Sequence, residues 1–356
     1  MPNINRLPSV APQSVLVAMS GGVDSSVAAA LLLEQGHACA GVYLQLLSSA
    51  DAAAANNAQA AARQLNIPFH VFDFSKEFED AVLRPFANSY LRGETPNPCA
   101  ACNKNIKFPA VLEHADALGC GFIATGHYVR KEYDGRHQLR RAMDPNKDQS
   151  YFLYSLTQAR LARARFPLGE LTKTQVRAAA EERGLRCAHK PESQDICFVP
   201  GGDYGAFLER FLGRPLAPGD FVDPRGGVLG RHRGTARYTL GQRKGLGLAL
   251  PRPGYVLAIR PEDNTVVVGG EPALYSRELT AHSINFIAVD SLQRPMRCRA
   301  KIRSRQDARP AVAEQLDERT IRVLFDEPQR AITPGQAAVL YDGDYVVGGG
   351  TIQGQA

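Results

Sequence analysis

The stretch Ser20–Ser26 (SGGVDSS) constrains this chain more than any other feature, because it separates a short apolar run from a helical stretch. Val15–Met19 predicts a strand, and the Ala- and Leu-rich segment that follows, ended by Gly36, predicts a helix. Glycines let the backbone approach phosphate closely, and a helix N-terminus adds unpaired N–H groups and a positive dipole end. A simple Ser-capped turn is the structural alternative.

The charge of this loop is unusual for a phosphate site. It lacks the Gly-Lys-Ser/Thr sequence of a Walker A motif, so it does not indicate ordinary handling of a γ-phosphate. Asp24 is an unexpected neighbour for phosphate unless it helps to hold a magnesium ion. We therefore expect a nucleotide loop of another class.

Alternating strands and helices continue beyond the loop. The expected strands are 40–46, 69–74 and 121–125, and the expected helices are 52–65, 77–91, 107–118 and 172–183. This alternation predicts an α/β doubly wound parallel sheet. After about Val199, Gly and Pro become frequent and short β-like runs appear at 255–259, 265–268, 296–304, 320–325 and 337–341. They predict small mainly-β domains, the last a β-barrel.

We place the domain boundaries where the amino-acid composition and the expected elements change. We expect a flexible tail over 1–13, the α/β domain over 14–204, a small central β-rich domain over 205–274 and a C-terminal β-barrel over 275–356. The apolar runs are too short to cross a bilayer, so no membrane association is expected. Residues 1–13 lack the apolar segment of a signal peptide.

Seven cysteines are present, an odd number that argues against a disulfide framework and for a reducing cytoplasm. Cys99 and Cys102 form a Cys-x-x-Cys pair in a proline-stiffened loop, where Lys104 and Lys107 would favour thiolate. Cys197 follows on a segment that reads as strand-like. The remaining four are expected to be small hydrophobes: Cys39, Cys120, Cys187 and Cys298. No second pair at zinc-ribbon spacing follows.

Basic residues gather in the second half of the chain. Eight lie between Arg225 and Arg260 without an Asp or Glu, and Arg160, Arg163 and Arg165 extend the set. Alternation along an expected strand would place five on one face: Arg297, Arg299, Lys301, Arg303 and Arg305. A phosphate backbone would neutralise them, although pairing with acidic neighbours is an alternative. Without an aromatic stacking array, we expect recognition of shape and backbone, with one flipped base.

The loop resembles that of the PP-loop ATP pyrophosphatases, which implies cleavage between the α- and β-phosphates and an adenylated substrate. From about Val15 to the C-terminus the chain resembles the bacterial-type tRNA-specific 2-thiouridylase (MnmA/TrmU) family. The matching stretches are AMSGGVDSS (18–26), TPNPCAACNKNIKF (95–108), ATGHYVR (124–130), NKDQSYFLY (146–154), SQDICF (193–198), YTLGQRKGLG (238–247) and FDEP…TPGQAAV (325–339).

This resemblance implies a cytoplasmic sulfurtransferase that uses ATP and Mg²⁺ to convert a uridine of tRNA, at position 34 of the anticodon, into 2-thiouridine. A sulfur donor, either a cysteine desulfurase or a sulfur-relay protein, is its implied partner. The implied catalytic residues are Cys102 and Cys197, the second carrying a persulfide, with a Cys102–Cys197 disulfide left at the end. The implied ATP-binding residues are Ala18, Met19, Ser20, Gly21, Gly22, Val23, Asp24, Ser25, Leu44 and Gly126.

The same resemblance implies that the target base meets Asn97, Pro98 and Cys99. The implied tRNA contacts are His127, Lys147, Asp148, Gln149, Arg303, Ser304 and Gln336. Two positions depart from the family: Leu44 stands where a methionine is usual, and Cys99 where many members have Asp. Cys99, Cys102 and Cys197 could together bind a [4Fe–4S] cluster. Delivery of sulfide by such a cluster is an open alternative to the persulfide.

Two further alternatives remain open at this point. Another PP-loop ligase acting on tRNA would not need Cys102 and Cys197. A non-catalytic iron–sulfur or tRNA-binding protein would not need the SGGVDSS loop. The sequence does not identify the sulfur donor, the set of tRNAs or the oligomeric state.

Overall fold

The computed structural model of the chain describes residues 12–47, 52–190 and 196–354. The tail expected over 1–13 lies almost wholly outside the described residues, as do residues 193–195 of the SQDICF stretch. The chain divides into two compact units, which are considered separately. The first unit comprises residues 1–78 and 103–192, and the second comprises residues 79–102 and 193–356.

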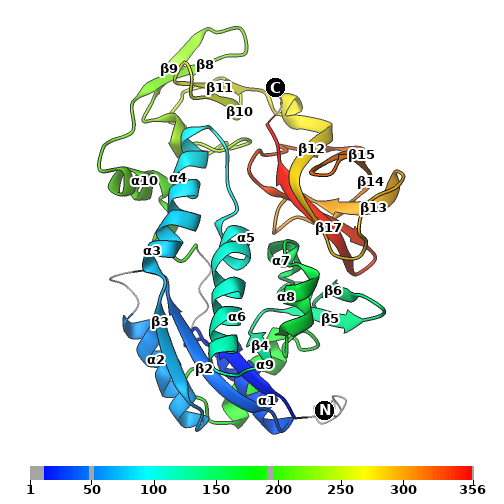
Figure 1. Cartoon of the computed structure of the whole chain (residues 1–356). Coiled ribbons are helices and arrows are strands. Elements are labelled where there is room, and N and C mark those ends of the chain that lie inside the picture. Colours follow the sequence, from blue (N-terminus) through cyan, green and yellow to red (C-terminus); the bar gives the residue numbers. More distant parts are fainter. Residues whose placement is uncertain (1–11, 48–51, 191–195, 355–356) are drawn as a thin grey trace. The chain divides into compact units, whose positions relative to one another are not determined.

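A five-stranded parallel sheet organises the first unit (Figure 1). Its strands are β1 (Ser14–Ala18), β2 (Ala38–Gln45), β3 (Phe69–Asp73), β4 (Phe122–Thr125) and β7 (Ala164–Arg165). Their order is β3-β2-β1-β4-β7, and every pair is parallel. This order confirms the doubly wound α/β fold. The order reverses between β1 and β4, and ligands of such sheets bind outside the carboxyl ends of the strands at that point.

The first unit contains helices as well as this sheet, and some of them pack directly on its strands. The helices are α1 (Val23–Glu34), α2 (Ala52–Gln64), α3 (Ser75–Phe78), α6 (Phe108–Ala117), α7 (Ser150–Leu153), α8 (Gln158–Arg163) and α9 (Lys173–Glu182). Helix α1 is buried over most of its length, because it packs on the sheet, on α2 and on α9. Helix α6 packs on β1 and β4 and follows a π-helical turn, Asn103–Lys107.

Two details differ from the sequence prediction. The helix expected over 77–91 is interrupted: α3 is followed by a π-helical turn, Glu79–Leu83, and then by α4 (Arg84–Leu91), which has Pro85 in its first turn. Proline lacks an N–H, so it suits a helix start rather than a helix interior. The antiparallel hairpin of β5 (Val129–Tyr133) and β6 (His137–Arg141) was not expected, although Asp134-Gly135 is a turn signal.

The second unit contains α4, α5 (Pro98–Cys102), α10 (Tyr204–Leu212) and a small sheet. The strands of this sheet are β8 (Gly219–Val222), β9 (Val228–His232), β10 (Tyr255–Arg260) and β11 (Thr265–Gly269), in the order β10-β11-β8-β9. Phe221, Val256 and Val266 form its core. Short 3₁₀ turns occur at Pro200–Gly202, Thr235–Arg237 and Glu271–Leu274.

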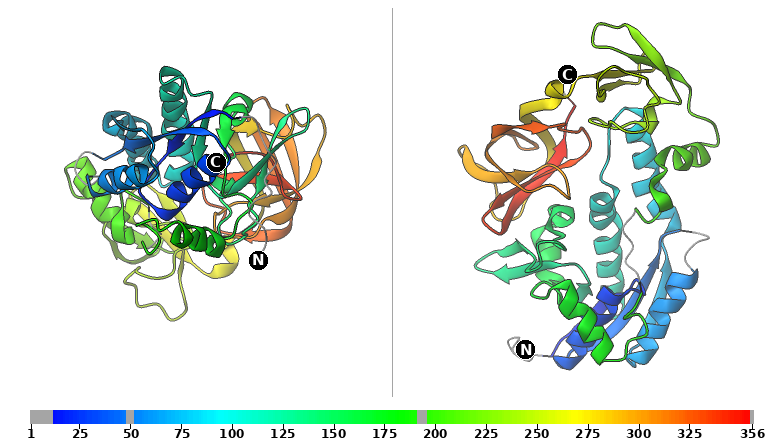
Figure 2. Two further views of the ribbon diagram at one scale, coloured as in Figure 1. Left: turned by 90° about the horizontal axis from the view of Figure 1, so that it is seen from below. Right: turned by 180° about the vertical axis from the view of Figure 1, so that it is seen from behind.

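The C-terminal part of this unit is a closed antiparallel barrel, which confirms the β-barrel predicted at this end of the chain (Figure 2). Its strands are β12 (Tyr275–Phe286), β13 (Met296–Lys301), β14 (Arg309–Asp317), β15 (Thr320–Arg330), β16 (Ala337–Asp342) and β17 (Tyr345–Ile352). The order is β12-β15-β14-β13-β16-β17, and β17 pairs back with β12. Alternate residues such as Ile321, Val323 and Phe325 fill the interior.

Within the described ranges, no helix combines the length and the apolar character that crossing a bilayer requires.

Candidate functional site

The loop Ser20–Ser26 lies at the carboxyl end of β1, where the strand order reverses. The loop is braced internally: Ser25 Oγ accepts from the Ser20 N–H at 3.1 Å, and Ser26 Oγ donates to the Gly22 carbonyl at 2.9 Å. Gly22 precedes α1 and provides no side-chain cap. The first-turn amides of α1 therefore remain suited to binding an anion.

Residues from three neighbouring strands meet at this edge of the sheet. A Cβ atom on Gly126, which follows β4, would lie 2.8 Å from the Ser25 nitrogen and 2.9 Å from the Asp24 carbonyl carbon. Only glycine therefore allows the loop after β4 to approach the phosphate loop this closely. Leu44 is half-buried near the end of β2. The structure thus brings the expected loop residues, Leu44 and Gly126 to one edge of the sheet.

Asp24 is held by two side chains that sequence reasoning missed. Its Oδ1 accepts from Lys173 Nζ and from Tyr128 Oη, both at 2.6 Å. Lys173 is nearly buried at the start of α9, where its own N–H donates to Asp144 Oδ2 at 3.0 Å. The only hint in the sequence was the helix cap at Thr172, which places Lys173 at the first helical position.

A second lysine contacts the loop, since Lys190 Nζ donates to the Gly21 carbonyl at 3.3 Å. Lys173 and Lys190 therefore offset the negative charge of Asp24. The second Asp24 oxygen, Oδ2, has no hydrogen bond to the described residues, so it fits a magnesium ion that also binds phosphate.

The expected tRNA contacts of the first unit are largely engaged in internal hydrogen bonds. His127 Nδ1 lies 2.8 Å from Thr125 Oγ1, and burial followed by the charge of Lys107 lowers the pKa of His127 to about 3. Asp148 accepts from the Ser150 N–H and hydroxyl, and Gln149 Oε1 accepts from the Tyr128 N–H at 2.9 Å. Lys147 is half-buried on the same loop.

Two of the candidate cysteines lie on or beside α5 in the second unit. Asn97 Oδ1 accepts from the Ala100 N–H at 3.1 Å and so caps the helix. Within α5, Cys99 is exposed, whereas Cys102 is buried with 6% exposure at the last position.

Cys197 lies in a turn of the second unit, so the expectation of a strand-like segment is wrong. The turn is closed by a bond from the Val199 N–H to the Ile196 carbonyl at 2.9 Å. The next residue, Phe198, packs edge-on against Phe86 with ring centroids 5.1 Å apart. This aromatic contact fixes the turn while leaving Cys197 exposed.

The cluster alternative does not fit the observed arrangement. Across residues 12–47, 52–190 and 196–354, no three His, Cys, Asp or Glu side chains are grouped so that they could hold a metal ion. A [4Fe–4S] cluster needs its thiolates gathered around it. Cys99, Cys102 and Cys197 are not gathered in this way, and no step is derived through a cluster.

The cysteines expected to be structural match that expectation. Burial raises the pKa of Cys39 to about 11 and that of Cys298 to about 11, so both remain thiols at neutral pH. Burial also raises the pKa of Cys120, and Cys187 is half-buried.

The basic strand was only partly predicted. Strand β13 ends at Lys301, so Arg303 and Arg305 do not continue its alternation as expected. Arg303 instead turns its guanidinium to the Ala331 carbonyl at 2.9 Å and to Thr333 Oγ1 at 3.0 Å. Arg297 forms an ion pair with Asp326. This contact agrees with the alternative that the basic residues pair with acidic neighbours.

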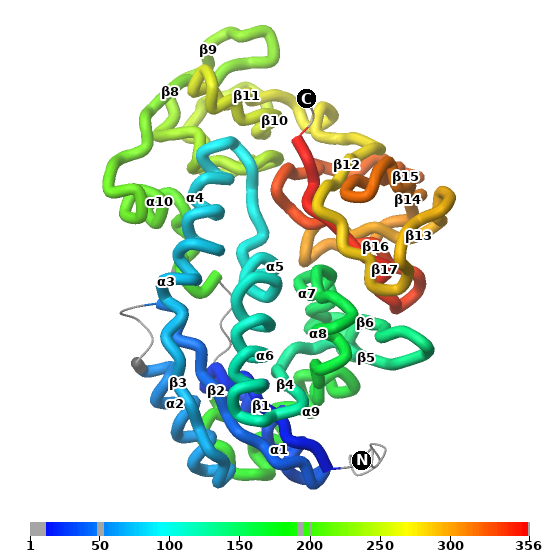
Figure 3. Tube along the Cα trace, viewed as in Figure 1, coloured from blue at the N-terminus to red at the C-terminus, as the bar shows by residue number. Residues whose placement is uncertain are grey.

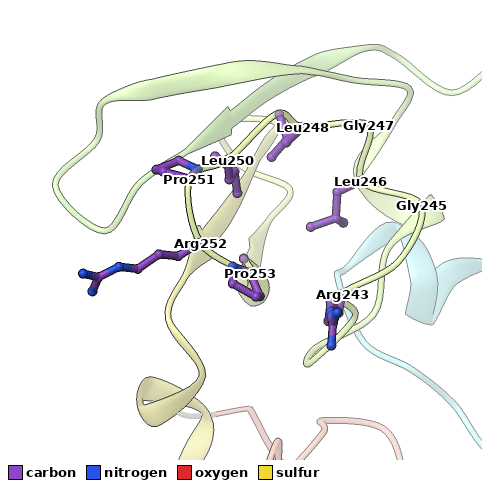
Figure 4. Close-up of a pocket in the computed structure, with 10 residues that line it drawn as sticks. Arg243, Gly245, Leu246, Gly247, Leu248, Leu250, Pro251, Arg252 and Pro253 are labelled. Carbon is purple, nitrogen blue, oxygen red and sulfur yellow. The ribbon is translucent and has the colours of Figure 1, made fainter.

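The basic run of the central sheet is partly neutralised by acids outside it. Arg237 binds Glu209 at 2.7 Å, and Arg231 binds Asp220 at 3.0 Å. A cavity of about 420 Å³ lies on the loop 243–254 of this sheet (Figure 4). Figure 4 shows Arg243 and Arg252 directed away from each other, so they do not converge on one ligand.

Comparison with known proteins matches all three parts of the chain. Residues 13–201 match the family described as the tRNA methyl transferase HUP domain. Residues 205–270 match the tRNA methyl transferase PRC-barrel domain, and residues 276–352 match the aminomethyltransferase β-barrel domain.

Full-length relatives decide the family. The tRNA-specific 2-thiouridylase MnmA of Acetivibrio thermocellus is 49% identical over 96% of this chain and 99% of that protein. The MnmA proteins of Carboxydothermus hydrogenoformans and Clostridioides difficile are 49% and 44% identical, each over 96% of this chain and 98% of theirs. The chain therefore belongs to the tRNA-specific 2-thiouridylase (MnmA) family.

Proposed function

We propose that this chain is a sulfurtransferase that uses ATP to convert uridine to 2-thiouridine in tRNA, at position 34 of the anticodon. The observation that carries the proposal is the uncapped SGGVDSS loop at the reversal point of the sheet, packed against Gly126 and neutralised by Lys173. Such a loop binds a pyrophosphate group without the machinery for γ-phosphate transfer.

The first step is adenylation of the base. Uridine O2 attacks the α-phosphate of ATP, and pyrophosphate leaves while the loop amides and the lysines absorb negative charge. Magnesium, held by Asp24 and the phosphates, would supply further charge neutralisation. AMP is a far better leaving group than oxide, so the C2 atom of the adenylated base becomes susceptible to attack by sulfur.

The second step transfers sulfur. The terminal sulfur of a persulfide on Cys197 attacks C2, forming a C2–S bond. The Cys102 thiolate then attacks Cys197 Sγ, the S–S bond to the transferred sulfur breaks, and AMP departs with O2. A Cys102–Cys197 disulfide remains, and a cellular thiol must reduce it. Exposure of Cys197 in its turn suits loading by a donor, either a cysteine desulfurase or a sulfur-relay protein.

Other residues then take supporting roles. Asn97, Pro98 and Cys99 are assigned to the target base. The tRNA contacts are assigned to Lys147, Asp148, Gln149, Arg303, Ser304 and Gln336. His127 is assigned to tRNA as a neutral imidazole. The loop residues Ala18 to Ser25, with Leu44 and Gly126, are assigned to ATP.

We assign residues 14–204 to the catalytic domain, 205–274 to the central domain and 275–356 to the barrel that contacts tRNA. A reducing cytoplasm suits the free thiols that this chemistry requires.

Cysteine variants test the function directly. Purified protein, MgATP, a sulfur donor and unmodified tRNA should yield 2-thiouridine, measured by mass spectrometry of tRNA nucleosides. Cys102→Ser and Cys197→Ser should each abolish it while tRNA-dependent release of pyrophosphate continues, because adenylation precedes sulfur transfer. Cys187→Ser, a half-buried thiol outside this chemistry, is the matched control. Undiminished thiolation by both serine variants would favour another PP-loop ligase.

The cluster alternative is tested separately. Protein purified without oxygen is analysed for iron and acid-labile sulfide, and its thiolation rate is compared before and after chelation. We expect full activity from the metal-free protein with a persulfide donor. Activity that requires about four irons per chain would contradict the persulfide route.

A further inference from the structure

The loop 243–254 of the small sheet carries positive charge that no acidic side chain of the described ranges neutralises. Three cationic residues of this loop are exposed, and their side chains form no hydrogen bond and no ion pair with the described residues: Arg243, Lys244 and Arg252. Arg231 of the same sheet differs, because it pairs with Asp220 at 3.0 Å. No Asp or Glu occurs over residues 225–260. The three charges therefore repel one another unless an anion from outside the chain neutralises them.

This loop is held in one shape although it contains no helix and no strand. Its base is closed by two backbone bonds, from the Gly241 N–H to the Val256 carbonyl at 2.8 Å and from the Val256 N–H to the Gln242 carbonyl at 3.0 Å. Three leucines of the loop pack on the core of the small sheet: Leu246, Leu248 and Leu250. The backbone that carries the cations is therefore ordered before a ligand arrives, which lowers the entropy cost of binding.

The direction of the side chains indicates the kind of anion. Arg243 and Arg252 line the same cavity of about 420 Å³ but are directed away from each other, so they do not surround one small anion (Figure 4). An extended polyanion, whose charges repeat along a backbone, can meet each cation separately. Lys and Arg side chains bind the phosphates of nucleic acids in this way. The loop therefore fits a nucleic-acid backbone better than a single phosphate or carboxylate.

The base of the loop adjoins the part of the barrel that is assigned to tRNA. Figure 3 shows the trace passing from the small sheet through a short connection into β12 of the barrel. Arg330, at the end of β15, donates from Nη2 to the Gly241 carbonyl at 3.3 Å, and a Cβ atom on Gly241 would lie 2.8 Å from Ala331 Cβ. The Ala331 carbonyl accepts from Arg303 Nη2 at 2.9 Å. One residue, Ala331, thus contacts both the base of the loop and an assigned tRNA contact.

We propose that the tRNA-binding surface extends from Arg303 of the barrel onto the loop 243–254, where Arg243, Lys244 and Arg252 bind phosphates of the tRNA backbone. This inference rests on the proposed function and deepens it, because it gives the small sheet a role in binding the substrate. Phosphate contacts fix the position of a nucleic acid but carry no sequence information. The loop therefore adds affinity for tRNA in general, and the choice of the target base is left to other residues.

A triple variant that combines Arg243→Gln, Lys244→Gln and Arg252→Gln tests the proposal, because it removes the charges and keeps polar side chains. The Kd for unmodified tRNA is measured by fluorescence anisotropy between about 50 and 200 mM KCl. The variant should bind about 10- to 100-fold more weakly at the lower salt concentration. The slope of log affinity against log salt should become shallower by about 2 to 3, about one unit for each lost phosphate contact. The KM for tRNA in thiolation should rise in parallel.

Arg231→Gln is the matched control, because it removes a positive charge from the same sheet where that charge is already paired with Asp220. It should change the Kd for tRNA by less than about twofold. Urea unfolding checks that the triple variant is folded, and the single variant Lys244→Glu replaces it otherwise, with the same change expected at smaller size.

Two outcomes would overturn the proposal. One is a triple variant whose Kd for tRNA and salt slope equal those of wild type. The other is a triple variant that binds tRNA normally but accepts sulfur more slowly from a protein donor, which would show that the loop binds an acidic protein. Wild type that binds tRNA without forming 2-thiouridine would refute the proposed function, whereas the salt slopes would still decide this contact.

Discussion

At the scale of single residues, the charge balance of the phosphate loop is the main finding. Asp24 is the only charged residue in Ser20–Ser26, and it would repel a nucleotide if it stood alone. Lys173, 149 residues away in sequence, donates to it and removes that repulsion, and Lys190 adds a second positive charge. The two lysines therefore place positive charge beside a loop that has no Walker lysine.

Replacement of Lys173 by Met should weaken MgATP binding about 10- to 100-fold, because Asp24 is left uncompensated beside the phosphates. The measurement is calorimetric titration with a non-hydrolysable ATP analogue, and tRNA affinity should remain unchanged. Lys76→Met removes an exposed lysine of α3 and serves as the control. Equal nucleotide affinity for Lys173→Met and wild type would show that the ion pair is irrelevant to the nucleotide.

Residue-level prediction from sequence succeeded where the signal was local. The position of the SGGVDSS loop between a strand and a helix was predicted from the residues next to it in the sequence, and the structure places it between β1 and α1. Lys173 and Gln336 were different, since their contacts exist only after α9 packs on α1 and after the barrel closes. No local pattern encodes such contacts, so neither the contact of Lys173 with Asp24 nor the bonds from Gln336 to Thr95 and Pro96 could be predicted from the sequence.

At the scale of elements, two adjacent glycines of the phosphate loop have different tasks. Gly21 has φ +70°, and a Cβ there would lie 2.7 Å from the Ala54 carbonyl of α2. Gly22 has an ordinary φ of −97°, and the nearest atom to its Cβ would be Ser20 Oγ at 3.5 Å. Gly21 therefore fixes how α2 packs on the loop, whereas Gly22 leaves room for a phosphate.

Alanine at these two positions should separate folding from binding. Gly21→Ala should lower the free energy of unfolding by about 1–3 kcal/mol, through backbone strain and the clash with α2. Gly22→Ala should change it by less than about 0.5 kcal/mol and still weaken ATP binding. Urea unfolding and nucleotide titration measure the two effects. Equal loss of stability in both variants would contradict this division.

Element prediction from sequence was reliable for strongly patterned segments. The expected strand at 69–74 is observed as β3, Phe69–Asp73, and the expected helix at 172–183 as α9, Lys173–Glu182. Prediction of elements failed where polar residues alternate at a partly buried surface, as in the β5–β6 hairpin. It also failed at Cys197, whose turn depends on the distant aromatic anchor Phe86.

At the scale of the whole molecule, the fold disfavours the protonated form of several histidines. Burial lowers the pKa of His37, His127, His137 and His232, in the case of His127 to about 3. His232 is buried between the Gly234 N–H, which donates to Nδ1 at 3.0 Å, and the Asn264 carbonyl, 3.0 Å from Nε2. Protonation of Nδ1 would break the first of these bonds.

This arrangement predicts acid-sensitive stability. Below about pH 6.5 the unfolded chain binds more protons at these histidines than the folded chain does, so stability falls as the pH falls. Urea unfolding at about pH 7.5 and about pH 5.5 should show a loss of roughly 1–3 kcal/mol. His232→Gln should reduce this difference, while His189→Gln, which removes an exposed imidazole, should not. A stability that is equal at both pH values would contradict the assignment.

The proposed mechanism requires that ATP activates the O2 atom of the target uridine before sulfur arrives. The most direct test uses tRNA carrying oxygen-18 at O2 of that uridine, in a single turnover with MgATP and a persulfide donor. We expect the label to appear in AMP, because O2 leaves with the α-phosphate when C2 gains sulfur. Unlabelled AMP together with formation of 2-thiouridine would contradict adenylation of O2 before sulfur transfer.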